Sequence, residues 1–381
     1  MWIACRHYGK SRLFACVWYY RLRMSTSKMV EEIRQQPAAL ERTLANELRG
    51  ATVLRRLFSQ KRPRLIILVA RGSSDNAAQF GRYLLEITTG IPVSLAAPSV
   101  LSLYKRSLEL KDVLVVAISQ SGESTDTNLV LQQARRKGAF TVGITNRRAS
   151  TLAQVAEHVF LVRAGEEKSV AATKTYTGQL LALYLLAYAL GAAIQMDDLR
   201  RVIEAAGKAL GLEAEIAQRA QRYRFMEHAV VVGRGLNYSN ALEFALKLME
   251  TCYVVAERFS TADFLHGPIA IIEAAFPIFI FAPAGVTWPG VAQLLERMAK
   301  IEAETLIVTD LSNAGAVKRF QGKFTRDLCI PFRLRNKRQP SDLYTPIPYI
   351  VPAQLFAACL AEAKGLDPDH PRSLKKVTRT L

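Results

Sequence analysis

The chain has 381 residues, a formal net charge of +18, and an apolar content of 50%. This length suggests two or three domains with large cores, and the composition is that of a globular protein rather than a disordered or fibrous one. No apolar run looks long enough to cross a bilayer, so we expect no membrane partner. The positive charge suits anionic partners, either nucleic acid or small phosphorylated substrates, and does not choose between them.

The N-terminal end differs from the rest of the chain. Residues 1–23 contain five Lys or Arg residues and no acid, and their short apolar stretch at 13–20 makes a poor signal peptide. Met24 opens the run MSTSKMVEEIRQQPAAL, in which hydroxyl residues suited to helix caps precede helical periodicity. We expect Met24 to be the true start, within an N-terminal segment (1–52) that leads helically into the first domain.

The numbers and spacings of cysteine and histidine residues argue against disulfide bonds and metal sites. The five cysteines are odd in number and lack CxxC spacing, and no two of the five histidines share a ligand spacing. We therefore expect no disulfide framework, no metal and no cofactor, in a protein of the reducing cytoplasm.

Apolar runs alternate with helical patterns in both halves. They predict strands at 65–70, 92–96, 113–118 and 140–144, and again at 228–233, 276–282 and 304–308. A helical segment at 174–191, and the one after it, join the halves. This alternation predicts one parallel α/β sheet per half, with ligands at the carboxyl ends of the strands.

The two halves also repeat one another. The stretch LIILVARGSSDNAAQF at 65–80 resembles HAVVVGRGLNYSNALE at 228–243, and VAISQSGES resembles FIFAPAGVT. The glycine pairs Gly72/Gly235 and Gly122/Gly285 are both 163 positions apart. A shared offset at two landmarks indicates a tandem duplication.

A hydroxyl-rich turn (residues 119–125) follows the strand at 113–118 and precedes a helix predicted at 128–136. A helix N-terminus has free amides and favours an anion, and added hydroxyls donate further hydrogen bonds. Ordinary capping needs only one hydroxyl, whereas this turn has Ser119, Ser121, Ser124 and Thr125, so we favour a phosphate site over a simple cap. The second copy has Ala282, Pro283, Ala284 and Gly285 there and has lost these groups.

The second copy instead carries charges on an otherwise apolar helix. Glu243, Lys247 and Glu250 share one face at i, i+4, i+7 spacing. The spacing alone leaves two interpretations open, a solvent-facing ion-pair stripe and a wet cleft. Further on, His266 precedes Gly-Pro, whose tight turn would hold the imidazole, although a lone histidine is more often structural.

Taken together, the motifs ARGSSDNA, SQSGESTDT, SVAATKTYTGQL, GRGLNYSNALEFALKLMET, AERFSTADFLHGP and DPDHPRSLKKVTRTL resemble those of a known family. From about Met29 to the C-terminus the chain resembles the tandem sugar-isomerase (SIS) domain proteins, both the isomerase half of glucosamine-6-phosphate synthase and the SIS-type glucosamine-6-phosphate deaminase. The resemblance implies an α/β fold of two SIS domains, at 53–193 and 215–367, each a flavodoxin-like three-layer α-β-α sandwich with a parallel sheet. It further implies that the tail, 368–381, closes the active site.

The resemblance also assigns roles to residues. Glu250 would move a proton between C1 and C2 of the sugar, Lys247 would steady the charge on oxygen, and Glu243 would lie beside them. Lys376 would form an imine with the ketose. His266 would assist ring opening in the neighbouring subunit's site, which implies a homodimer. The residues implied to contact the sugar phosphate are Gly72, Ser73, Ser74, Ser119, Gln120, Ser121, Ser124, Val170 and Ala172.

Three residues depart from the synthase pattern. Arg71 stands where a small residue is usual, Ala172 replaces a serine, and Met249 replaces a lysine, while ARGSSDNA and FSTADFLHGP look more like the deaminase branch. The N-terminal segment (1–52) that precedes the first expected domain is too short for the synthase's glutaminase domain.

We therefore expect glucosamine 6-phosphate to be converted to fructose 6-phosphate and ammonia through an enolamine. The alternatives are a synthase-like isomerase that uses free ammonia, a galactosamine-6-phosphate or ketose–aldose phosphate isomerase, and a non-catalytic sugar-phosphate sensor. We expect no nucleic acid partner, because residues 29–60 show no convincing helix-turn-helix turn.

Overall fold

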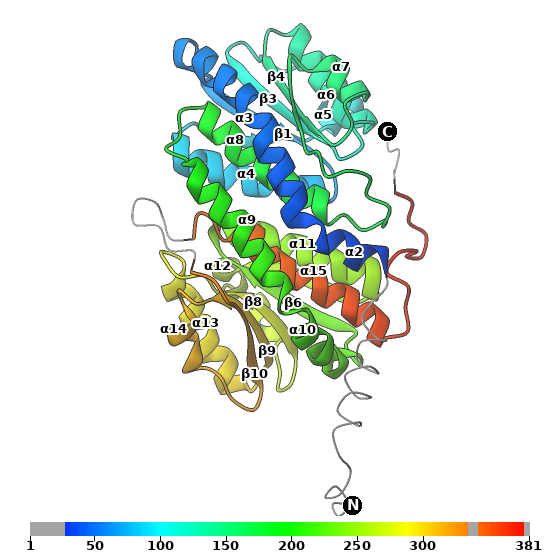
Figure 1. Ribbon diagram of the computed structural model, residues 1–381, viewed down its shortest axis with the longest axis vertical. Helices are drawn as coiled ribbons and strands as arrows, with labels where there is room; N and C mark the ends of the chain where they lie inside the picture. Colours follow the sequence, from blue (N-terminus) through cyan, green and yellow to red (C-terminus); the bar gives the residue numbers. More distant parts are fainter. Residues whose placement is uncertain (1–26, 334–341, 377–381) are drawn as a thin grey trace, which may run out of the picture.

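The structure is a computed structural model that describes residues 27–333 and 342–376. The expectation about Met24 and the preceding 23 residues therefore lies outside the described residues. Two five-stranded sheets form the framework of the chain (Figure 1).

Both sheets are parallel and have the same topology. The first has the order β2-β1-β3-β4-β5 and the second β10-β9-β8-β6-β7. In each half, the second strand lies at an edge, and the first strand lies between the second and the third. This order is that of flavodoxin-like folds, as expected. The strands are β1 (Leu65–Val69), β2 (Val93–Leu95), β3 (Val113–Ile118), β4 (Phe140–Thr145), β5 (His158–Leu161), β6 (His228–Gly233), β7 (Val255–Ser260), β8 (Pro277–Phe281), β9 (Glu304–Asp310) and β10 (Thr325–Ile330).

The seven predicted strands are all present, and three further strands were missed. The missed strands, β5, β7 and β10, lie at sheet edges. An edge strand is only partly covered and tolerates charged side chains, such as Glu257 and Arg258 in β7. The charged strands β7 and β10 lack the continuous apolar run by which buried parallel strands are recognised, whereas β5 is apolar but only four residues long.

The helices sandwich both sheets and form a shared middle layer (Figure 1). The middle helices contact one another across the halves, and a single apolar cluster runs through them from one sheet to the other. They are α2 (Lys28–Arg34), α3 (Gln36–Gln60), α4 (Ser73–Thr89), α8 (Lys174–Ala189), α9 (Met196–Leu210), α10 (Glu213–Ala220), α11 (Tyr238–Cys252) and α15 (Pro346–Ala363). Residue 53, the expected start of the first domain, lies within α3.

Further helices cover the two outer faces. These are α5 (Ser99–Ser102), α6 (Thr125–Arg136) and α7 (Thr151–Val155) on the first sheet, and α12 (Thr261–Leu265), α13 (Trp288–Ile301) and α14 (Ala314–Lys318) on the second. The alternation of β1 explains the layering, because Ile66 and Leu68 face the shared middle cluster while Leu65, Ile67 and Val69 pack on the outer one.

One helix departs from the expectation that no apolar run is long enough to span a membrane, although a buried core helix meets the same criterion. By length and apolar composition alone α15 would qualify, among the helices that the structure describes. Its residues are almost all buried, and it packs against α9, α10 and α11. Burial in the middle layer accounts for its apolar character.

The topology brings two distant segments to one crevice. The connection that leaves β1 runs to β2 on one side, and the connection that leaves β3 runs to β4 on the other side. The two connections therefore leave the neighbouring strands β1 and β3 in opposite directions. Ligands in such sheets bind at this point, beyond the carboxyl ends of the strands. Here these ends continue into Arg71–Ser74 and into the hydroxyl-rich turn.

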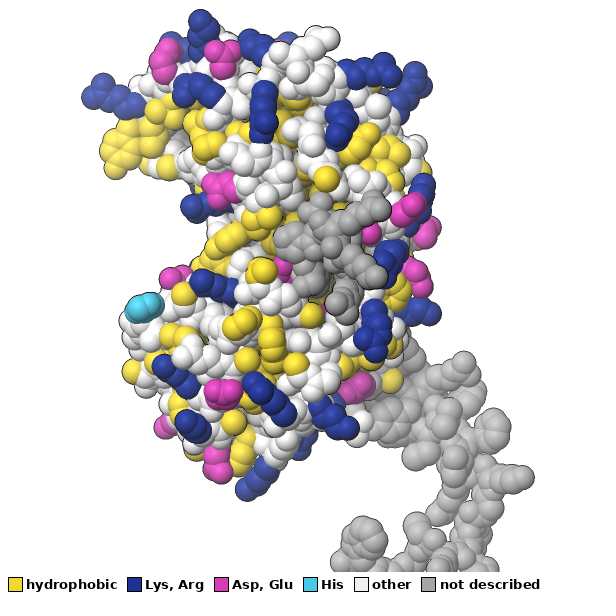
Figure 2. All heavy atoms as spheres, turned by 90° about the vertical axis from the view of Figure 1, so that its left-hand side faces the viewer, with side chains coloured by type: hydrophobic (Ala, Val, Ile, Leu, Met, Phe, Trp, Pro, Cys, Tyr) yellow, Lys and Arg dark blue, Asp and Glu magenta, His cyan; other side chains and the backbone are white. Residues whose placement is uncertain are grey.

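The excess positive charge is not concentrated in one patch on the face shown in Figure 2. Lys and Arg side chains are scattered over both halves (Figure 2). This pattern differs from the continuous basic stripe by which nucleic-acid-binding surfaces are recognised.

Candidate active site

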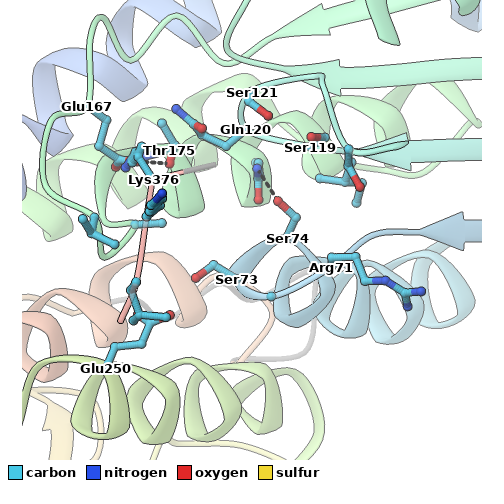
Figure 3. Close-up of a pocket in the computed structure, with 18 of the residues that line it drawn as sticks. Arg71, Ser73, Ser74, Ser119, Gln120, Ser121, Glu167, Thr175, Glu250 and Lys376 are labelled. Atoms are coloured by element: carbon cyan, nitrogen blue, oxygen red, sulfur yellow. Dashed lines mark hydrogen bonds and ion pairs between the residues drawn. The ribbon is translucent and has the colours of Figure 1, made fainter. Parts of the chain in front are cut away.

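A cavity of about 490 Å³ lies at the crevice between β1 and β3 (Figure 3). Side chains of the first half, the end of α11 and the C-terminal tail contribute to it. The lining residues are Arg71, Gly72, Ser73, Ser74, Ile118, Ser119, Gln120, Ser121, Ser124, Asp126, Glu167, Val170, Ala172, Thr175, Gln179, Glu250, Leu374, Lys375 and Lys376. All nine residues implied to contact the sugar phosphate are among them, together with Glu250 and Lys376.

The hydroxyl-rich turn wraps one end of the cavity. The Ser119 Oγ accepts the Gly122 amide at 3.1 Å and the Ser121 Oγ accepts the Glu123 amide at 3.2 Å. Both hydroxyls shape the turn and still have their own hydrogens to donate. Ser124 is the N-cap residue of α6, with its hydroxyl 3.0 Å from that of Thr127. The exposed Thr125, also counted in the sequence pattern, does not line the cavity.

The N-terminus of α4 faces the cavity beside this turn. Its N-cap, Gly72, has φ +58°, which favours glycine. Ser74 accepts a hydrogen bond from Gln179 Nε2 at 2.9 Å. The Ser73 hydroxyl instead donates to Glu243 Oε1 at 3.0 Å and lies 3.3 Å from Lys247 Nζ. Ser73 thus links the first half to α11 as well as lining the cavity.

The charged residues of α11 do not form a solvent-facing stripe. The side chains of Glu243 and Lys247 are fully buried against α4, and only Glu250, 23% exposed, reaches the cavity. Lys247 Nζ lies 2.5 Å from Glu250 Oε2 and 3.4 Å from Glu243 Oε1. Burial would lower the pKa of Lys247, but the two carboxylates outweigh it and raise that pKa above its ordinary value. Lys247 is therefore a permanent cation beside Glu250.

The C-terminal tail supplies the other cation at this end of the cavity. Lys376 Nζ donates to Glu167 Oε2 at 2.8 Å and to the Ser169 carbonyl at 2.6 Å. Glu167 is fully buried; burial alone would raise its pKa, but Lys376 and hydrogen bonds from Thr173 and Thr175 lower it below the usual value.

The tail is held at two further points on its way to the cavity. Asp369 accepts the backbone amides of Lys28 and Met29 at 2.8 Å each, at the start of α2. Arg372 lies over the Tyr253 ring, 4.3 Å from its centroid, directly beyond α11. These contacts carry the chain from the second half back to the first.

His266 lies apart from this group. It is exposed at the end of α12 and does not line the cavity of its own chain. The adjoining Gly267 has φ +146°, so the expected tight turn is present. Its role in a neighbouring subunit's site stays a prediction.

Sequence reasoning missed several lining residues. The sequence analysis gave Arg71 only as a departure from the synthase pattern, and it did not predict Asp126, Glu167, Thr175 or Gln179 as site residues. Thr175 and Gln179 are one helical turn apart, a spacing that could have placed them together on the cavity face of α8. Within 27–333 and 342–376, no cluster of three His, Cys, Asp or Glu side chains is suited to a metal ion.

Two α/β domains of one topology accompany a cavity that combines a hydroxyl-rich turn with a paired carboxylate, an arrangement typical of small-molecule sites. The SIS domain model matches residues 57–189 and 225–325, so the chain belongs to the SIS domain family.

Curated relatives place the chain more narrowly. It is 34% identical over 354 residues to the glutamine--fructose-6-phosphate aminotransferase [isomerizing] of Pyrococcus horikoshii, and 33% identical over 352 residues to that of Aquifex aeolicus. In both cases the match covers 91% of this chain and 57% of the relative. The chain thus spans little more than half the length of these relatives.

Solved structures that are similar to this chain include an aminotransferase of the same kind. The C-terminal domain of glucosamine-fructose-6-phosphate aminotransferase from Francisella tularensis superposes with a TM-score of 0.80 at 26% identity, over 91% of this chain and 98% of that one. The glucosamine-6-phosphate deaminase of Thermotoga maritima shares the fold, with a TM-score of 0.72 at 21% identity, over 93% of this chain and 100% of that one.

Proposed function

We propose that this protein is an amino-sugar phosphate deaminase that converts glucosamine 6-phosphate to fructose 6-phosphate and ammonia through an enolamine intermediate. One observation carries the proposal: a single cavity has the hydroxyl-rich turn at one end and Glu250, paired with a buried lysine, at the other (Figure 3). The similarity to aminotransferases named for fructose 6-phosphate and for isomerisation supports the choice of sugar phosphate.

The phosphate binds at the hydroxyl-rich turn. Ser119, Ser121 and Ser124 supply hydroxyl donors, and the N-terminus of α6 adds free amides. Anchoring the phosphate fixes the far end of the open-chain sugar, so C1 and C2 are held against Glu250. The cavity volume lies within the range of about 300–1,000 Å³ that is usual for small-molecule sites.

Glu250 then moves one proton along one face of the sugar. As a carboxylate it takes the proton from C2, while the C1 carbonyl oxygen gains a proton and the enolamine forms. The same carboxyl returns a proton to C1, which leaves a protonated imine at C2 that gives its extra proton to water on hydrolysis. Water adds to that imine, ammonia departs, and the C2 ketone of fructose 6-phosphate remains. Lys247, whose Nζ lies 2.5 Å from Glu250 Oε2, stabilises the negative charge that develops on the sugar oxygen.

Two further groups take part in this proposal. Lys376 lies where it could hold the ketose, and its ion pair with Glu167 keeps it in the cavity. His266 of a second copy assists ring opening, which makes the protein a homodimer with shared sites.

A mixing experiment tests the shared site. Glu250→Gln and His266→Gln chains are each expected to be impaired, but a mixed dimer has one site with both native residues. Random assortment should therefore restore about a quarter of the wild-type activity. No recovery on mixing, with dimers confirmed by light scattering, would argue against a shared site.

The deciding assay measures ammonia and fructose 6-phosphate release from glucosamine, galactosamine and mannosamine 6-phosphates. Stoichiometric release of both products from glucosamine 6-phosphate is expected, with loss of deuterium placed at C2. The reverse direction, with fructose 6-phosphate and ammonia, separates the deaminase from a synthase-like isomerase. Binding of all three sugars without turnover would leave the sensor function instead.

A further inference from the structure

A pair of opposite charges lies at the phosphate end of the cavity and has no role in the chemistry above. Arg71 follows β1, and its Nη2 donates to Asp126 Oδ2 at 2.8 Å, in the first turn of α6. Both side chains line the cavity. Asp126 is 5% exposed, whereas Arg71 is 48% exposed, so the pair presents its guanidinium to solvent and buries its carboxylate.

The position of Asp126 creates an electrostatic problem for an anionic ligand. It belongs to the first turn of α6, just after the N-cap Ser124, and it lines the same cavity as the hydroxyls of the turn. A phosphate monoester carries about −1.5 to −2 charge at pH 7, and a like charge on Asp126 would repel it. The cavity therefore needs a cation at this end before it can accept a dianion.

Arg71 is suited to supply that cation. A guanidinium has five N–H donors in a planar fork, and the ion pair with Asp126 uses one nitrogen. The remaining donors can engage phosphate oxygens in a bidentate manner. In Figure 3, Arg71 extends away from Glu250, which leaves the reacting end of the sugar free of it.

We propose that Arg71 is a phosphate-binding residue of this site, held in place by Asp126, and that it makes the cavity selective for phosphorylated sugars. Asp126 acts as the positioning residue and Arg71 as the direct ligand. The proposal rests on the proposed function only in its choice of a sugar phosphate, since it concerns binding and not turnover.

The test measures binding by calorimetry on the full chain, with inorganic phosphate and with 2-amino-2-deoxyglucitol 6-phosphate, an open-chain sugar alcohol that cannot react. Arg71→Ala should weaken both ligands by about 10–100-fold, the usual loss for a charge-assisted hydrogen bond. Arg71→Lys keeps the charge but not the fork and should fall in between.

The double variant Arg71→Ala/Asp126→Asn separates a ligand from a merely structural residue. Removing the unpaired carboxylate should restore part of the affinity that Arg71→Ala loses, because repulsion of the phosphate disappears. Arg234→Ala is the matched control. Arg234 occupies the equivalent exposed position after β6, where Pro289 replaces the aspartate, and it does not line the cavity. It should bind both ligands like the wild type.

The possible outcomes are distinct. Affinity within twofold of wild type in Arg71→Ala, a loss confined to the sugar phosphate and absent for inorganic phosphate, or no phosphate binding by the wild type would each overturn the inference. If Arg71→Ala weakens both ligands while the wild type releases no ammonia, the proposed function fails and the phosphate role of Arg71 stands.

Discussion

At the scale of single residues, Glu250 differs from the two other charged residues of its helix. It alone is partly exposed to the cavity, while Lys247 beside it is buried and charged. This arrangement couples a reactive carboxylate to a fixed cation, so its basicity can be removed without altering the packing of α11.

Replacing Glu250 with Gln therefore tests the base directly. The amide keeps the shape but cannot accept a proton, so kcat should fall by about 10²–10⁴-fold, the usual contribution of a general base. Affinity for the non-reacting sugar alcohol phosphate should stay within a few-fold, as calorimetry would measure. A wild-type kcat would remove Glu250 as the base and turn attention to Glu243 on the same face.

A second prediction at the scale of single residues concerns Glu167 and the pH dependence of folding stability. Its pKa is lowered in the folded protein, so it stays ionised to lower pH there than in the unfolded chain. Its stabilising effect should be complete above its ordinary pKa of 4.5 and be lost as the pH falls through the lowered folded value. In urea titrations, the stability difference between wild type and Glu167→Gln should thus be constant near neutrality and shrink below about pH 4.5.

A surface pair provides the comparison for Glu167. Glu296, 57% exposed, lies 3.4 Å from Arg319. Exposed pairs contribute little, so Glu296→Gln should change the pH profile hardly at all. Equal profiles for the two variants would mean that the Glu167–Lys376 pair does not stabilise the tail.

At the scale of elements, the hydroxyl-rich turn depends on one glycine. Gly122 has φ +68°, and a Cβ there would lie 2.2 Å from the Ser150 hydroxyl oxygen. The Gly122 carbonyl also accepts Asn128 Nδ2 at 2.9 Å and the Leu152 amide at 3.0 Å, which ties the turn to α6 and α7. The turn cannot admit a side chain here without moving.

Gly122→Ala should therefore destabilise the protein by about 1–3 kcal/mol and weaken phosphate binding. Gly138→Ala is a matched control, because Gly138 has φ +77° but nothing within 4 Å of a new Cβ. Both variants should lose stability in urea unfolding, but only Gly122→Ala should lose phosphate affinity. Normal phosphate binding by Gly122→Ala would contradict a phosphate site built on this turn.

At the scale of the whole molecule, the two copies of the turn differ in what lies beside the following helix. Thr287, which corresponds to Ser124, is the N-cap residue of α13. Its hydroxyl donates to Asp342 Oδ2 at 3.3 Å, and Asp342 is 3% exposed. The chain's own carboxylate thus occupies the helix N-terminus where the first half would bind phosphate.

One phosphate ligand per chain should consequently bind. Titration calorimetry with the non-reacting sugar alcohol phosphate, against a protein concentration from amino-acid analysis, should give a stoichiometry of about one. Ser121→Ala should weaken that single site markedly, by the loss of a charge-assisted hydrogen bond. Two equivalent sites per chain would show that the diverged turn at Ala282–Gly285 still binds an anion.

The sequence by itself determined the features that depend on neighbours along the chain. Continuous β-branched runs predict the buried strands, the shared offset predicts the duplication, and the hydroxyls at 119, 121 and 124 mark the turn at the helix N-terminus, whose binding of an anion stays a prediction. These signals are local, because strand, turn and helix N-terminus are set by residues a few positions apart.

The tertiary structure alone decided which chemical groups meet. Lys376 pairs with Glu167 across 209 positions, Ser73 with Glu243 across 170, and Arg71 with Asp126 across 55. Spacing on α11 could not say which end of its charged face reaches the cavity, since that depends on how closely α4 packs on it. Three of the four edge strands escaped prediction for the same reason, because the burial of a residue is fixed by the elements that cover it and not by its own sequence.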